Sequence, residues 1–116
     1  MDIFFSNRRD EKIFNDYKKI IQKFGVPMAA RISLRLQQMR AAPTLSVFKQ
    51  AHPRCHALDG DRDGEFAADL LHPHRLIFRP DHEPLPRDEF GGLNLSKVTT
   101  IRILEIEDYH GKRKRK

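Results

Sequence analysis

The 116-residue sequence has no tryptophan, a single cysteine and no long apolar run. One cysteine, Cys55, excludes an internal disulfide, so we expect a reducing, cytoplasmic setting. No stretch approaches the roughly 18 uncharged apolar residues of a membrane-spanning helix. The apolar run in the first ten residues is very short and flanked by charges, unlike a secretory signal. We therefore expect a cytoplasmic protein that makes no use of a membrane.

An excess of positive charge is present, but only at one end of the chain. Lysine plus arginine is 22 and aspartate plus glutamate is 16, and residues 112–116 are five consecutive cations. Without them the balance is 17 against 16, so the body is nearly neutral. Such a tail is typical of a protein with an anionic partner, most often a nucleic acid, and equally of a solvated, disordered end.

The chain length and the 39% apolar content suit one domain with one modest core, expected over residues 1–111, followed by the basic tail 112–116. Apolar side chains recur at helical spacing over residues 7–24 and again over 28–41. A shorter helical turn is predicted over residues 44–50. The first half of the chain is thus expected to be helical.

The second half has the period of strands. Strands are predicted over residues 55–58, 66–70, 75–79 and 98–109, with an extended loop over 80–95. Helices followed by strands indicate an α+β fold. The expected architecture is two N-terminal helices packed on a small antiparallel sheet, with the helices gathered on one side.

Two patterns imitate metal sites. Asp59, Asp61, Asp63 and Gly64 spell the opening of a calcium loop, but the twelfth position is Leu70 instead of a bidentate carboxylate. An acidic hairpin turn is the better interpretation.

Cysteine and histidine side chains lie at loosely zinc-like spacings in His52/Cys55 and His72/His74. Zinc needs four converging ligands, and histidines beside prolines in turns are common. We expect no metal site.

The last predicted strand ends in a group of titratable residues, Glu105 to His110. Histidine exchanges protons near neutral pH, and neighbouring carboxylates favour its charged form. From composition alone, an exposed strand end with an incidental histidine explains this run as well as an active site does.

Taken together, four short motifs resemble the RelE/HigB-type toxins of bacterial toxin–antitoxin systems, in the plasmid-maintenance killer branch. The motifs are the His56–Gly64 segment HALDGDRDG, Phe66, the RLIF run of residues 75–78 and the EDYH run of residues 107–110. The ordered set is more specific than any one piece, and the helix pair upstream fits the same architecture. The sequence departs from the branch at Asp59, where many members carry lysine, and in the long 80–95 loop.

The resemblance implies a RelE-like, microbial-RNase-like fold and a ribosome-dependent endoribonuclease that cleaves translated mRNA. In such enzymes a ribose 2′-hydroxyl attacks the adjacent phosphate, and neither a metal nor an organic cofactor takes part. The implied partners are the ribosome with its mRNA and a helix-turn-helix antitoxin of the HigA type. Operator DNA is reached only indirectly, through the antitoxin.

The resemblance also implies roles for individual residues. Arg75 resembles the cation that stabilises the phosphate, since a guanidinium binds two phosphate oxygens at once. His110 and His56 resemble the acid/base pair, and Tyr109 could stack on a base or bind the phosphate. The residues expected to bind RNA are Arg62, Arg79, Asp108, Lys112, Arg113 and Lys114.

Two other functions compete with this hypothesis. A ParE-like toxin of related fold would inhibit DNA gyrase by binding, without cutting RNA. A non-catalytic nucleic-acid-binding regulator is compatible with Asp59 and with the basic tail. The set of Arg75, Tyr109 and His110 favours cleavage, because a gyrase binder does not need a terminal acid/base histidine.

Overall fold

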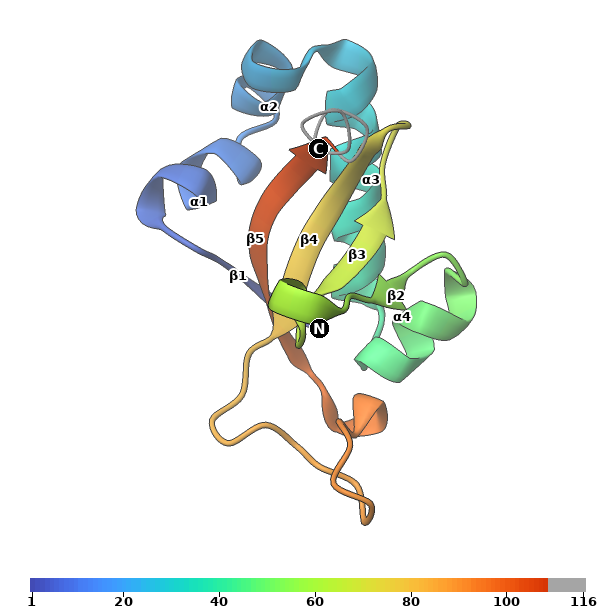
Figure 1. Ribbon diagram of the computed structural model, residues 1–116. Helices are drawn as coiled ribbons and strands as arrows, with labels where there is room; N and C mark the ends of the chain where they lie inside the picture. The colour runs from blue at the N-terminus through green and yellow to red at the C-terminus, as the bar shows by residue number, and fades with distance from the viewer. Residues whose placement is uncertain (109–116) are drawn as a thin grey trace.

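The computed structural model describes residues 1–108, which form four helices and a five-stranded sheet (Figure 1). The helices are α1 (Arg8–Phe14), α2 (Tyr17–Phe24), α3 (Val26–Ala41) and α4 (Leu45–Ala51). The strands are β1 (Asp2–Phe5), β2 (His56–Ala57), β3 (Phe66–Asp69), β4 (His74–Pro80) and β5 (Thr100–Asp108). Short 3₁₀ turns are η1 (Gly60–Arg62) and η2 (Leu95–Lys97).

The sheet has the strand order β1-β5-β4-β3-β2. Strands β2 to β5 pair antiparallel, as predicted, and the α+β fold class is confirmed. The expectation of a wholly antiparallel sheet was wrong at one edge, where β1 pairs parallel with β5 and Ile3 lies opposite Ile101. Strand β1 has only four residues, too few for an alternating pattern to be recognised in the sequence. Its partner β5 lies near the other end of the sequence.

The helix expected over residues 7–24 is in fact two helices. Asn15 ends α1, and the Asp16 side chain accepts a hydrogen bond from the Lys18 backbone N–H at 3.1 Å, which caps α2. The apolar period continues across this break, so periodicity alone did not reveal it. The remaining predicted elements are present with ends shifted by one or two residues, and the end of the strand predicted to residue 109 lies outside the described residues.

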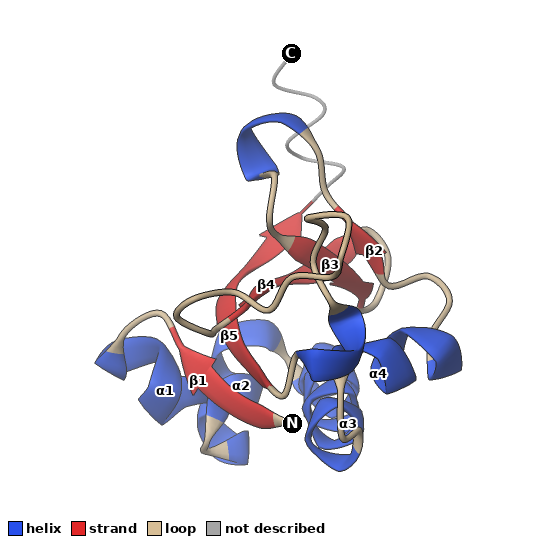
Figure 2. Cartoon of the chain, turned by 90° about the horizontal axis from the view of Figure 1, so that it is seen from below, coloured by secondary structure: helices blue, strands red, loops and turns tan. Residues whose placement is uncertain are grey.

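All four helices lie on the same side of the sheet (Figure 2). The core between them is built from α3 residues such as Ile32 and Leu36 and from sheet residues such as Leu76, Phe78 and Ile103, all at most 2% exposed. Burial of such side chains is the main stabilising term of the fold. Within residues 1–108 no helix has the length and apolar character needed to cross a membrane.

Removal of the α2 cap is expected to destabilise the fold modestly. Asp16→Ala leaves the Lys18 N–H without its side-chain acceptor and should lower the free energy of unfolding by about 1 kcal/mol. Asp16→Asn keeps an acceptor oxygen and should stay close to the original stability. Urea denaturation of the three proteins measures both effects, and equal losses in the two variants would mean that the cap is not what Asp16 contributes.

Candidate active site on the open face of the sheet

The sheet face turned away from the helices carries charged side chains at its centre. Strand register places Arg75 directly opposite Glu107 and Ile77 opposite Glu105. Because side chains alternate along strands, these four residues lie on one face. Ile77 is fully buried without belonging to the helix-side core, so this face is covered over Ile77 and open elsewhere.

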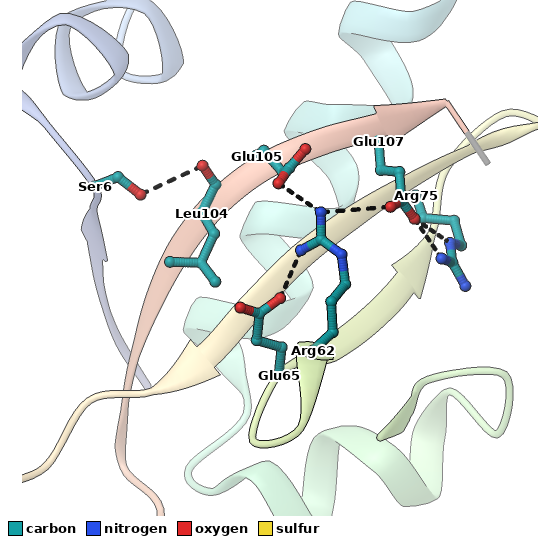
Figure 3. A network of polar contacts seen from close by, with 7 residues as sticks. All are labelled: Ser6, Arg62, Glu65, Arg75, Leu104, Glu105 and Glu107. Atoms are coloured by element: carbon teal, nitrogen blue, oxygen red, sulfur yellow. Dashed lines mark hydrogen bonds and ion pairs between the residues drawn. The ribbon is translucent and has the colours of Figure 1, made fainter. Parts of the chain in front are cut away.

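The cover comes from the connection between β2 and β3, which brings Arg62 over β4 and β5 (Figure 3). Arg62 Nη1 donates to Glu65 at 2.6 Å, and Nη2 donates to Glu105 at 2.8 Å. The same Nη2 lies 3.5 Å from Glu107. The hydrogen bond to Glu105 raises the pKa of Arg62, and burial opposes the rise in part. Arg62 is therefore a permanent cation clamped between three carboxylates.

Arg75 is the second guanidinium of this network. Its Nε donates to Glu107 Oε2 at 3.1 Å, and its Nη2 donates to the same oxygen. Glu107 is only 5% exposed, and these two arginines stabilise its charge. The pair Arg75–Glu107, which joins β4 to β5, is thus connected to Arg62 through Glu107.

The structure brings some predicted site residues together and separates others. Arg62 and Arg75 meet through Glu107, as Figure 3 shows. His56 lies on the edge strand β2 and lines, with Arg75, a pocket of about 360 Å³. Arg79 lies outside this network, 3.5 Å from Asp81.

The end of β5 is described as far as Asp108, which is exposed and lies level with His74 of β4. The other predicted site residues lie outside the described part of the chain; they are Tyr109, His110, Lys112, Arg113 and Lys114.

Three carboxylates of this site received no role from the sequence. Glu105 and Glu107 stand two apart in a strand, which is a signal that they share a face. Glu65 has no such signal, because it follows the acidic turn and reaches the site only through the fold of the β2–β3 connection.

The acidic turn itself is the 3₁₀ turn η1, which begins after the exposed Asp59. Among residues 1–108 no group of three or more histidine, cysteine, aspartate or glutamate side chains converges as a metal site would.

The single thiol is expected to be unreactive in the folded protein. Cys55 is 2% exposed, and burial raises its pKa to about 11. Since the thiolate is the reactive species, an aromatic disulfide reagent at pH 8 should label Cys55 slowly in the native protein. Labelling should become rapid and stoichiometric in denaturant. Rapid labelling under native conditions would contradict the burial of this side chain.

Known proteins match this chain in their three-dimensional structure but not in their sequence. No family model and no curated protein sequence matches the chain. Among solved structures, a YoeB/ParE toxin from Agrobacterium tumefaciens superposes with a TM-score of 0.52 at 12% identity, covering 94% of this chain and 99% of that one. The fold is that of a YoeB/ParE-type toxin.

A YoeB-YefM complex from Staphylococcus aureus is similar to the same extent. It superposes with a TM-score of 0.52 at 19% identity and covers 92% of this chain and 94% of that one. Both likenesses cover almost the whole of each chain, so the predicted RelE-like fold is confirmed. Membership of the RelE/HigB killer branch stays a prediction, because such low identities establish the fold alone.

Proposed function

We propose that the protein is the toxin of a toxin–antitoxin system and acts as a ribosome-dependent endoribonuclease. The observation that carries the proposal is the pairing of Arg75 with Glu107, beside Arg62 and Glu105, on the open sheet face. The strand that bears the two glutamates leads directly into Tyr109 and His110. In this proposal the proton-exchanging groups that follow β5 in the sequence act beside these cations.

The proposed reaction needs only groups that this chain supplies. A base takes the proton of a ribose 2′-hydroxyl, whose oxygen attacks the adjacent phosphorus. The bond from phosphorus to the 5′-oxygen breaks, an acid gives that oxygen a proton, and the products are a 2′,3′-cyclic phosphate and a 5′-hydroxyl end. In this proposal His56 and His110 are the acid/base pair, and Arg75 stabilises the charge on the phosphorane oxygens.

The carboxylates have a positioning role in this proposal. Glu107 holds the Arg75 guanidinium, and Glu105 holds that of Arg62 at 2.8 Å. A guanidinium has five N–H donors in a fixed fork, so part of each can stay on its carboxylate while the rest binds a phosphate. Arg62, Arg79, Asp108 and the basic tail residues Lys112, Arg113 and Lys114 are the proposed contacts to RNA.

The proposed partners follow from the same hypothesis. One of the similar structures is a YoeB-YefM complex, which supports a protein antitoxin for this chain. We propose a helix-turn-helix antitoxin of the HigA type that connects the protein to operator DNA, with the ribosome and mRNA in the cytoplasm as targets. No cofactor is proposed.

Induction in bacteria, with mapping of new RNA 5′ ends, tests the proposal. In-frame cuts within translated messages, absent when translation is blocked, are the expected result. Because one similar structure is described as a YoeB/ParE toxin, gyrase inhibition is the second candidate. Intact RNA together with gyrase-linked DNA damage would favour gyrase inhibition instead. If neither RNA cuts nor DNA damage were found, the protein would be a non-catalytic nucleic-acid binder.

A further inference from the structure

Two adjoining pockets lie at the β3 edge of the sheet. Strand β2 pairs with Phe66 and Ala67, so Ala68 and Asp69 of β3 extend past it. One pocket, of about 360 Å³, opens there beside Arg75. The other, of about 290 Å³, opens beside α3 and α4. They share Arg54, Asp69 and Leu70 as lining residues, so they adjoin, and we refer to the two pockets together as the groove.

The lining of this groove is strongly basic. It contains four histidines and one carboxylate, that of Asp69. Its four arginines are Arg31, Arg35, Arg54 and Arg75. The body of the protein is nearly neutral, so this concentration of cations is local and not a general property of the surface.

Arg75 is already paired with Glu107, and the carboxylate in the groove compensates little of the remaining charge. Asp69 pairs with Arg54, whose side chain is 86% exposed, and an ion pair this exposed is easily exchanged. Arg35 donates one hydrogen bond from Nε to the Asp69 backbone carbonyl at 2.9 Å and another from Nη1 to the Gln38 side chain at 2.8 Å.

Arg31 and Arg35 lie close enough to repel each other. Burial lowers the pKa of Arg35, and the charge of Arg31 lowers it further. An anion held between these two guanidiniums would offset the repulsion.

We propose that this groove binds the phosphodiester backbone of single-stranded RNA and guides it to the open sheet face. The path of the RNA toward Arg75, where the groove ends, rests on the proposed function, in which Arg75 belongs to the active site. Guanidinium–phosphate contacts, which can be bidentate, suit arginines of the lining such as Arg31 and Arg54. The four histidines of the lining offer further hydrogen-bonding groups along the path.

RNA fits the groove better than an acidic protein segment does. A protein segment is normally recognised through apolar anchors, with charges at the rim. Here the arginines lie within the lining, and its apolar members are mostly small residues such as Ala51, Pro53 and Pro73. Recognition through phosphates needs no apolar anchor.

The test is the binding of a fluorescent 12-nucleotide 2′-O-methyl RNA to the full chain, measured by anisotropy over a range of salt. The 2′-O-methyl groups prevent cleavage, so affinity is read without the reaction. Arg31→Gln combined with Arg54→Gln should weaken binding on the order of tenfold at low salt. Losing two phosphate contacts should also reduce the slope of log affinity against log salt by about 1.4.

Arg8→Gln combined with Arg9→Gln is the matched control, since both residues are exposed on α1 and the change in charge is equal. We expect this control to bind within twofold of the original protein, and thermal melts should show both double variants folded. Equal losses in the two variants, or no loss in the groove variant, would overturn the proposal. So would a groove variant that keeps its RNA affinity while losing affinity for a poly-glutamate peptide.

The outcome is separable from that of the proposed enzyme. If cells show no RNA cuts but the groove variant loses oligonucleotide affinity, the groove is an RNA site and the enzymatic proposal fails. If cuts occur and the groove variant binds as the original protein does, the groove proposal alone fails.

Discussion

Arg75→Ala is expected to lower cleavage of ribosome-bound message by about 10²–10³-fold, the usual cost of one transition-state charge contact. The reason is that Arg75 is the guanidinium on the open face that adjoins both the Glu107 carboxylate and the His56 pocket. Cleavage by purified protein on programmed ribosomes, at saturating ribosome concentration, measures the rate of the chemical step.

Two further variants serve as controls, one for the shape of the Arg75 side chain and one for the loss of a positive charge. Arg75→Lys keeps the charge but loses the planar fork, so its rate should fall between those of the original protein and the alanine variant. Arg8→Ala removes an exposed cation of α1 and should cleave at the original rate. If Arg75→Ala stayed folded and cleaved as fast as Arg8→Ala, the assignment of Arg75 would be wrong.

Glu107→Ala is expected to lower the free energy of unfolding by about 3 kcal/mol, within the range for breaking a buried ion pair. Glu107 is 5% exposed, accepts hydrogen bonds from Arg75 and lies 3.5 Å from Arg62. Its removal takes this carboxylate from the partly buried Arg75 guanidinium and one of three carboxylates from Arg62. Urea denaturation, followed by far-ultraviolet circular dichroism, measures the change.

Glu105→Ala is the control for this prediction. Glu105 also binds Arg62, at 2.8 Å, but its side chain is 48% exposed, so its loss should cost less than about 1 kcal/mol. Glu107→Gln keeps the shape and an acceptor oxygen and should fall between the two alanine variants. Equal destabilisation by Glu105→Ala and Glu107→Ala would show that burial does not set the strength of this network.

Much of the architecture could be predicted because its elements have local signals. The apolar stripe of α3 and the alternation of more and less buried residues along β5 repeat over enough residues to be recognised, and β4 is marked by its apolar run at residues 76–78. β1 has four residues and a partner from the far end of the chain, so no local signal identifies it. The break between α1 and α2 depends on one capping side chain, Asp16, inside an uninterrupted apolar period.

In the candidate site, too, some features follow from local sequence patterns and others depend on long-range contacts. Alternation of side chains along a strand is enough to place Glu105 and Glu107 on one face, and the local pattern also puts Arg75 in a strand next to a turn. Which charges meet depends on contacts between distant parts of the chain. The register of β4 on β5, with its irregularity at Ile77 and Phe78, sets Arg75 opposite Glu107. The β2–β3 connection brings Arg62 and Glu65 over the same face, a long-range contact that depends on packing of the whole sheet and not on any local pattern.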